Sequence, residues 1–290
     1  MLRSDAVDVT IDPIHGGEVR SIRHRPSGTE LLFRSPWAPK RSRRGQPLDE
    51  EGWVAGYRGG WQVLFPNAGN ACVHDGRRHG FHGAASVDPW DWDGDALRYV
   101  DETFEYVRRP RLDGVRFWFE EHILNLTSRP RAFVSVQHLA FGQGLLSPTV
   151  YVDADVSRAE RLLEDEVALE AAGDRRLDWD RWRLLSLADS ESRFGVIEVP
   201  SARYRISNPT RGLGVEVAWT ATLWPFAWYW AEVRSIQARP WAGRSEVLAL
   251  EPASTPHSLG LSVSERRGDA TVLEGGQQLD ARIEVAILTS

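Results

Sequence analysis

Hydrophobic and polar residues alternate with a period of two along much of the chain. Val7, Val9 and Ile11 lie on one face of a first predicted strand, and Asp8 and Thr10 lie on the other. The same alternation marks residues 115–120 and 283–287. A period of two is typical of strands with one buried face, so the pattern predicts several half-buried strands.

Turn residues separate these stretches at short intervals, at His15-Gly16-Gly17, Asp113-Gly114 and Glu274-Gly275-Gly276 among others. Many short strands at this spacing favour a β-sandwich or barrel. No break in composition marks a boundary, so we predict one all-β domain over residues 1–290. Ser157 to Ala172 is the best helical candidate, but its apolar spacing does not decide between helix and other structure. Pro39 to Glu51 is predicted to be an exposed loop, because acidic residues balance its arginines.

Composition excludes several classes of function. The net charge is −6 and the only cysteine is Cys72, which argues against a chain-wide nucleic-acid surface, an intrachain disulfide or a Cys-rich zinc site. The N-terminal residues lack the apolar core of a signal peptide. Val217 to Ala231 is too short to span a bilayer. We therefore expect a cytoplasmic protein with neither a nucleic-acid nor a membrane partner.

The densest group of chemically versatile residues is the run from His74 to Gly83, with three histidines, an aspartate, two arginines and three glycines. Turn residues predict a loop here, and functional side chains concentrate on loops. His79 and His82 with Asp75 or Asp88 could bind a metal, but the spacing matches no helical zinc signature. The alternatives are histidines bonded only to backbone, or a site for a polar ligand, which we favour.

Two further residues each end an apolar row. Alternation places His138 on the face of Val134 and Val136, and Glu251 on the face of Val247 and Ala249. A buried histidine is more often a hydrogen-bonded core residue, and a glutamate at a strand end could cap a turn. Converging in one pocket, however, an imidazole and a carboxylate suit proton transfer to and from a hydroxylated substrate.

At these residues the chain resembles the aldose 1-epimerase (galactose mutarotase-like) superfamily, most closely a divergent bacterial branch. The matching pieces are Gly59 to Gly69, His79-Gly80-Phe81 with Trp90, His138 to Gly142, Leu223 to Trp230, and Leu250-Glu251-Pro252 with the tail Leu273 to Gly276. Each piece is short, but their order and spacing together are specific. The resemblance implies a galactose mutarotase-like β-supersandwich with an open face that binds a sugar.

The resemblance also implies roles for individual residues. Glu251 would be the general base and His138 the general acid of anomer interconversion, and His79 would polarise oxygens at the anomeric end. The substrate contacts would come from Asn67, Arg78, His82, Trp61 and Trp230. No cofactor and no metal are implied, and the partner would be a small-molecule sugar bound by a monomer or homodimer.

The chain departs from the family pattern where many relatives carry an arginine. Ala68 follows Asn67, and His82-Gly83 follows Phe81. The substrate is therefore expected to differ from that of a standard galactose enzyme. It is also expected to be neutral or singly anionic rather than a nucleotide, because the motifs contain Arg77 and Arg78 but no glycine-rich phosphate loop at a helix start.

Two other functions compete with anomer interconversion. One is a carbohydrate-binding protein without turnover. The other is a lyase or hydrolase, because glycosidases need a carboxylate pair and Asp88, Asp91, Asp93 or Asp95 could supply a partner for Glu251.

Overall fold

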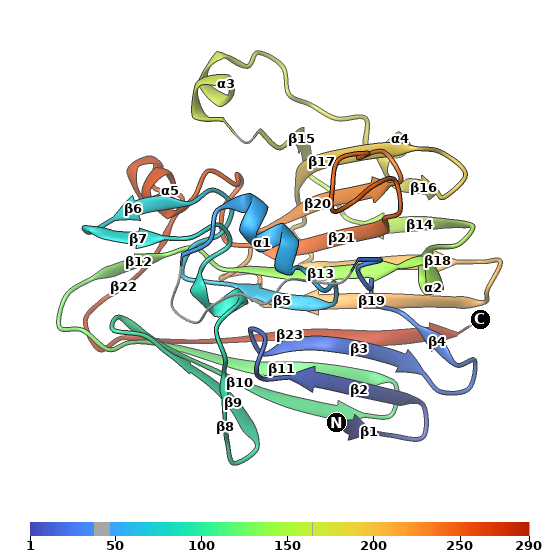
Figure 1. The fold of residues 1–290 in the computed structure, drawn as a ribbon, viewed down its shortest axis with the longest axis horizontal. Helices are drawn as coiled ribbons and strands as arrows, with labels where there is room; N and C mark the ends of the chain where they lie inside the picture. Colours follow the sequence, from blue (N-terminus) through green and yellow to red (C-terminus); the bar gives the residue numbers. More distant parts are fainter. Residues whose placement is uncertain (38–46, 164, 290) are drawn as a thin grey trace.

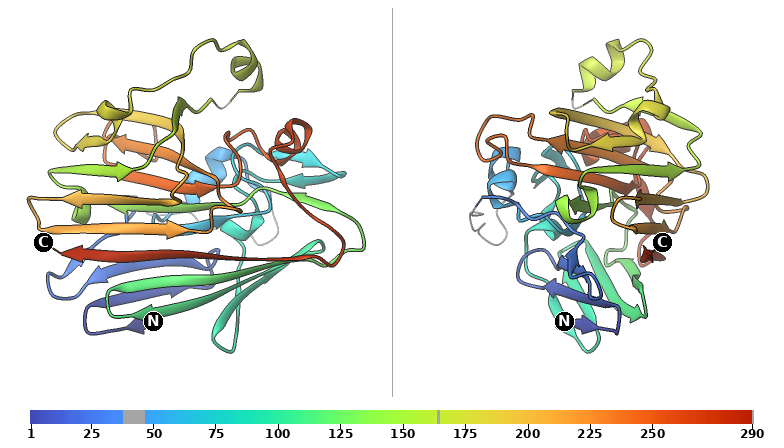
Figure 2. Two further views of the ribbon diagram at one scale, coloured as in Figure 1. Left: turned by 180° about the vertical axis from the view of Figure 1, so that it is seen from behind. Right: turned by 90° about the vertical axis from the view of Figure 1, so that its right-hand side faces the viewer.

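Two large antiparallel sheets lie face to face in the computed structural model, which describes residues 1–37, 47–163 and 165–289 (Figures 1 and 2). The ten-stranded sheet has the order β1 (Leu2–Arg3), β2 (Val7–Asp12), β3 (Glu18–His24), β5 (Trp61–Leu64), β13 (Val136–Gly142), β21 (Glu246–Ala253), β20 (Phe226–Val233), β17 (Glu191–Glu198) and β15 (Arg158–Arg161), with β4 (Thr29–Glu30) paired to β3. The nine-stranded sheet has the order β16 (Leu184–Ser186), β14 (Thr149–Ala154), β18 (Arg203–Asn208), β19 (Leu213–Trp219), β23 (Gln278–Thr289), β11 (Arg116–Asn125), β10 (Phe104–Asp113), β9 (Ala96–Val100) and β8 (Asp91–Asp93). The fold is therefore all-β, as predicted.

Smaller elements connect these strands. Two short strand pairs are β12 (Arg131–Phe133) with β22 (Thr271–Leu273), and β6 (Cys72–His74) with β7 (Arg77–His79). The helices are α1 (Glu50–Gly56), α2 (Gln143–Leu146), α3 (Glu166–Ala171), α4 (Trp179–Trp182), α5 (Leu261–Arg267) and the 3₁₀ turn η1 (Ala84–Ser86). Among the described residues, no helix is long and apolar enough to cross a membrane.

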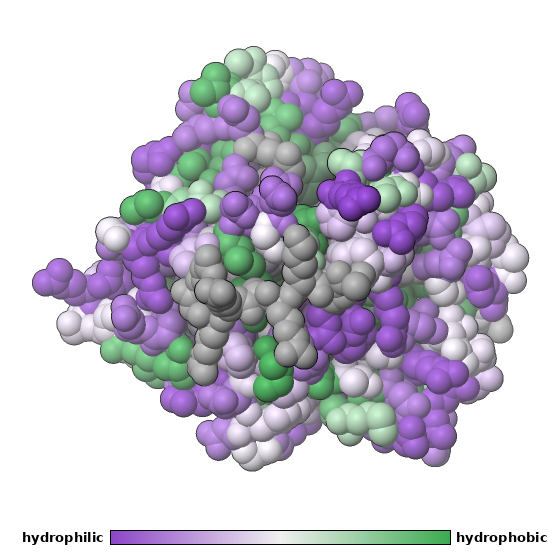
Figure 3. Space-filling view, in the orientation of Figure 1, coloured by the Kyte–Doolittle hydropathy of each residue, from purple (hydrophilic) through white to green (hydrophobic). Residues whose placement is uncertain are grey.

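The main hydrophobic core fills the space between the two sheets. Phe117 and Phe119 on β11 are buried there, and Trp61 on β5 packs edge to face against Phe119 at 5.3 Å between ring centroids. The predicted alternation is confirmed in β2, β11 and β23, whose inward residues are buried and whose outward residues are largely not. The face seen in Figure 3 is largely hydrophilic, with separate hydrophobic patches, as expected when both sheets bury one face against the other.

A charged group lies inside this core. The Arg108 side chain on β10 donates from Nε to Glu121 Oε1 at 2.8 Å, and both side chains are fully buried. Tyr106 donates its hydroxyl to the same carboxylate, and Arg108 also donates to Gln137 on β13. Such a pair is tolerated only when its remaining polar atoms are satisfied, and these neighbours satisfy most of them.

A second apolar cluster covers the opposite face of the ten-stranded sheet. Trp53 of α1 and the following Tyr57 pack there with small residues of the central strands, such as Ala140 and Ala249. Asp49 begins α1 by accepting a hydrogen bond from Gly52 N. This second face, with α1 lying over it, carries the candidate site.

The structure refines three local predictions. Residues 157–172 form strand β15 and then the short helix α3, which Asp165 caps. The run from His74 to Gly83 is the β6–β7 hairpin followed by a loop, not a loop throughout. The predicted loop over 39–51 lies partly outside the described residues, and its last two residues begin α1.

Candidate active site

His138 and Glu251 meet at the centre of the ten-stranded sheet. Strands β13 and β21 pair with Val136 opposite Ala253 and Ala140 opposite Ala249, which places His138 directly across from Glu251. His138 Nδ1 lies 2.9 Å from Glu251 Oε1, and the two side chains are only 5% and 4% exposed. The oxygen lies out of line for a hydrogen bond from the ring.

Aromatic rings surround the His138 imidazole. Its ring centroid lies 5.4 Å from Tyr57, 5.7 Å from Trp230, 5.8 Å from Trp53 and 6.0 Å from His82. Burial, and then the charge of Glu251, raise the pKa of Tyr57 well above its usual value. The phenol therefore stays protonated at neutral pH.

His82 is held in one tautomer by the backbone. Its Nδ1 accepts a hydrogen bond from Gly69 N at 3.0 Å, so the ring proton sits on Nε2. Burial, and then the neighbouring His138, lower the pKa of His82 well below its usual value. A neutral imidazole with a fixed Nε2–H can donate a hydrogen bond to a ligand oxygen.

Gly69 makes this arrangement possible. It has a φ of +77°, and a Cβ at this position would lie 1.8 Å from the carbonyl oxygen of Ser258. The close approach lets Asn70 N donate to Ser258 O at 2.8 Å. Only glycine fits both the positive φ and this contact, so the Gly69 backbone fixes His82 relative to the strands.

These side chains line one cavity of about 560 Å³, within the range typical of small-molecule sites. His82, His138 and Glu251 lie on its wall together with a large apolar surface. The main apolar contributors are Trp53, Tyr57, Phe194, Trp228, Trp230 and Trp241.

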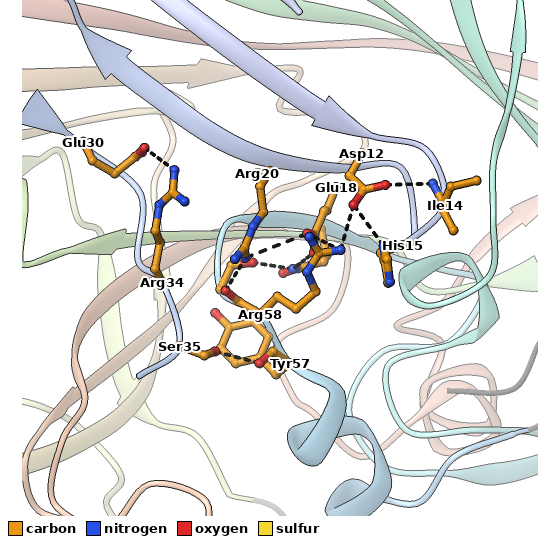
Figure 4. A network of polar contacts seen from close by, with 12 residues as sticks. Asp12, Ile14, His15, Glu18, Arg20, Glu30, Arg34, Ser35, Tyr57 and Arg58 are labelled. Carbon is orange, nitrogen blue, oxygen red and sulfur yellow. Dashed lines mark hydrogen bonds and ion pairs between the residues drawn. The ribbon is translucent and has the colours of Figure 1, made fainter. Parts of the chain in front are cut away.

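A polar network continues the row of His138 and Glu251 across the sheet. Its charged members Asp12, Glu18 and Arg58 are drawn in Figure 4. Gln62 on β5 lies opposite His138, and it donates to Glu18 on β3 at 3.0 Å. Arg58 Nη1 lies 3.3 Å from Glu18 and 2.7 Å from Asp12. Since Arg58 directly follows Tyr57, the network anchors the end of the α1 segment beside His138.

Glu18 in this network is expected to make stability depend on pH. Burial raises the pKa of Glu18 from 4.5 to about 7, against the opposing effect of Arg58. The folded protein therefore holds this proton more tightly than the unfolded chain, and that stabilisation is lost as pH rises from about 4.5 to 7. We expect the contribution to reach about 3 kcal/mol at most.

Urea unfolding at pH 5 and pH 7.5 measures this effect. Glu18→Gln is expected to lose less stability than the parent protein over this interval. The exposed Glu274→Gln serves as the control. An equal pH dependence in Glu18→Gln and the parent protein would contradict this assignment.

Four other residues predicted for the site do not line this cavity, namely Trp61, Asn67, Arg78 and His79. Trp61 lies in the core between the sheets, where Nε1 donates to Gln137 at 2.8 Å. Asn67 is fully buried, and its side-chain amide is hydrogen-bonded to backbone. Nδ2 donates to Gly80 O at 2.8 Å, and Oδ1 accepts from Leu261 N at 2.7 Å. Neither residue lines the cavity that holds His138 and Glu251.

His79 and Arg78 lie on the β6–β7 hairpin and line a separate cavity of about 430 Å³. Burial, and then Arg77, lower the pKa of His79 to about 4. The position near His138 that sequence reasoning gave to His79 is occupied by His82. His74, the third histidine of the run, pairs with Glu265 at 2.8 Å.

The acidic residues weighed as partners for Glu251 also lie elsewhere. Asp91 and Asp93 are on the edge strand β8 of the other sheet, and Asp95 pairs with Arg109 and Arg111. Asp88 lines the same separate cavity as His79. Within the described ranges, no three His, Cys, Asp or Glu side chains gather as metal ligands would.

Several lining residues were not singled out from sequence, namely Trp53, Tyr57, Phe194 and Trp241. Trp53 and Tyr57 are four residues apart and share one face of the α1 segment. This spacing was the sequence signal from which an aromatic face could have been predicted. Nothing local marks Phe194 or Trp241, because distant chain segments bring them to the cavity.

Several solved structures have a similar fold. A proposed aldose 1-epimerase from Klebsiella pneumoniae superposes with a TM-score of 0.76 at 13% identity, covering 99% of this chain and 78% of that one. The Slr1438 protein of Synechocystis sp. PCC 6803 gives a TM-score of 0.73 at 20% identity and coverages of 100% and 95%. A galactose mutarotase-like protein from Clostridium acetobutylicum gives 0.69 at 14% identity and coverages of 100% and 94%.

No protein-family model and no curated protein matches the sequence. The architecture is nevertheless that of the galactose mutarotase-like proteins. The resemblance stated from sequence is confirmed at the level of the fold, and the low identities agree with a divergent branch.

Proposed function

We propose that this chain is an aldose 1-epimerase-like enzyme that interconverts the anomers of a sugar by acid–base ring opening and closure. The observation that carries the proposal is the His138–Glu251 pair, an imidazole and a carboxylate 2.9 Å apart on the wall of one cavity. The hydroxyl oxygen and the ring oxygen are both bonded to the anomeric carbon. An imidazole and a carboxylate this close together can therefore contact both oxygens at once.

In the proposed reaction Glu251 removes the proton from the anomeric hydroxyl while His138 gives a proton to the ring oxygen. The bond between C1 and the ring oxygen breaks, and the anomeric carbon becomes an aldehyde. After rotation about C1–C2, His138 takes its proton back, Glu251 returns the other, and the ring closes as the opposite anomer. The protons balance over the cycle, so the enzyme returns to its starting state.

Two features of the site support these steps. The Nε2–H of His82 can donate a hydrogen bond to an oxygen at the anomeric end, because Nδ1 is already occupied by Gly69 N. The cavity of about 560 Å³ leaves room for the aldehyde to rotate. Trp230, at 5.7 Å and an interplanar angle of 30° from His138, offers an indole face beside the pair.

The test is anomer exchange followed by NMR over a panel of aldoses. We expect exchange of at least one aldose well above the rate in buffer at the same pH. Binding without acceleration would contradict the proposal and favour a carbohydrate-binding protein. Cleavage of a glycosidic bond in place of exchange would favour a hydrolase or lyase.

A further inference from the structure

The cavity extends well beyond the acid–base pair, along the strands of the ten-stranded sheet. Glu251 on β21 lies opposite Trp228 on β20, and Trp230 on β20 lies opposite Phe194 on β17. Neighbouring strands are about 4.8 Å apart, so β17 lies roughly 10 Å from β21. This span exceeds one sugar ring seated over His138 and Glu251.

Beside the acid–base pair, the cavity has an aromatic corner formed by Trp230 and Trp241. Their rings meet edge to face, with centroids 5.6 Å apart at an interplanar angle of 72°, and Trp37 supports Trp241 from 4.7 Å. Both indoles are only partly buried. Neither indole N–H donates a hydrogen bond within the part of the chain that the structure describes. Two ring faces and two free donors are thus available to a ligand.

The loop that carries Trp241 is fixed by a buried carboxylate. Glu232 at the end of β20 accepts from Ser235 N at 2.6 Å and from Ile236 N at 2.8 Å. The backbone of the loop then closes on itself, with Gly243 N donating to Ile236 O at 2.9 Å. Trp241 is therefore presented by a tied loop, which lowers the ordering cost of binding.

The charge of the lining limits what this corner can accept. Among the described residues that line the cavity there is no arginine or lysine. Phosphate groups are normally held by such cations or by helix N-termini. A phosphorylated sugar would therefore find no cationic side chain among the described lining residues.

We propose that the corner of Trp230 and Trp241 is a second sugar subsite, and that the substrate is an uncharged reducing disaccharide. The reducing ring sits over His138 and Glu251, a placement that rests on the proposed function. The second ring stacks its C–H faces on the indoles and accepts hydrogen bonds from their N–H groups. The cavity of about 560 Å³ falls within the range of roughly 300–1,000 Å³ that is typical of small-molecule sites.

Equilibrium binding tests the subsite without requiring turnover. Titration calorimetry would compare cellobiose and lactose with glucose, galactose and glucose 6-phosphate. We expect at least one disaccharide to bind about tenfold more tightly than either monosaccharide, and glucose 6-phosphate to bind most weakly. Trp241→Ala should weaken disaccharide binding by about two- to tenfold and monosaccharide binding by a smaller factor. Trp92→Ala, 45% exposed on β8, is the matched control and should change neither.

The outcomes separate this inference from the proposed function. Equal affinities for disaccharides and monosaccharides, or equal losses for both in Trp241→Ala, would overturn the subsite even if anomer exchange is catalysed. The subsite would also be overturned if glucose 6-phosphate bound more tightly than every other sugar tested. A disaccharide preference lost in Trp241→Ala would support the subsite even in the absence of exchange, which would count against the proposed function alone.

Discussion

Glu251→Gln is expected to lower kcat for anomer exchange by about 10²–10⁴-fold, the usual contribution of one general acid–base group. Glutamine keeps the size of the side chain and much of its hydrogen-bonding capacity, but it cannot accept the proton of the anomeric hydroxyl. Substrate affinity should change far less than kcat, because loss of a binding role would appear in KM. Steady-state kinetics with an NMR or polarimetric readout measures both constants.

Circular dichroism and thermal unfolding would accompany these kinetics. If Glu251 is only a structural residue, residual activity should follow the folded fraction of the variant. A folded Glu251→Gln protein that turns over at the parent rate would end the assignment of Glu251 as the base.

Arg108→Met is expected to destabilise the protein by about 3–5 kcal/mol, because it leaves the Glu121 carboxylate buried without its cation. Both side chains are fully buried, and the guanidinium also lies 3.7 Å over the ring of Phe119. Arg109→Met at the next position is the matched control. Arg109 pairs with Asp95 at the surface, where such pairs contribute at most about 1 kcal/mol.

Urea unfolding at pH 7 measures these differences. The double variant Arg108→Met with Glu121→Leu should regain much of the lost stability, since no charge is then left unpaired. Equal small losses in Arg108→Met and Arg109→Met would contradict the account of this core pair.

The period-two pattern was enough to predict the fold class and the faces of the central strands. His138 and Glu251 end up on one face of adjacent strands because each alternates with residues buried between the sheets, such as Leu139 and Leu250. Side chains of a strand must alternate, so this part of the site could be predicted locally. That the two strands are neighbours came only from the family resemblance.

Local patterns could not decide between His79 and His82. Both belong to the same glycine-rich run, but His79 ends a hairpin strand while His82 lies in the loop beyond it, at a φ of +62°. The choice depends on Gly69 N, which reaches His82 from a loop thirteen residues earlier. Contacts of this kind are set by tertiary packing and leave no local periodicity.

Asn67 and Trp61 show that a residue in a recognised motif need not contact the ligand. Their residue types suit sugar contacts, yet Asn67 ties loops together through Gly80 and Leu261, and Trp61 fills the core. A polar or aromatic residue in a motif can serve the frame of a site as well as its ligand. Burial and hydrogen-bond partners distinguish the two roles, and neither can be read from the sequence.

The central claim is that His138 and Glu251 act as one acid–base unit, and a double-mutant cycle on the anomer exchange rate tests it most directly. The parent protein, Glu251→Gln, His138→Asn and the double variant would be compared on the aldose or disaccharide that exchanges fastest. The account predicts large losses in both single variants, and a double variant little slower than the slower single variant, because both protons move in one step. Fully multiplicative losses, or near-parent rates in both single variants, would contradict it.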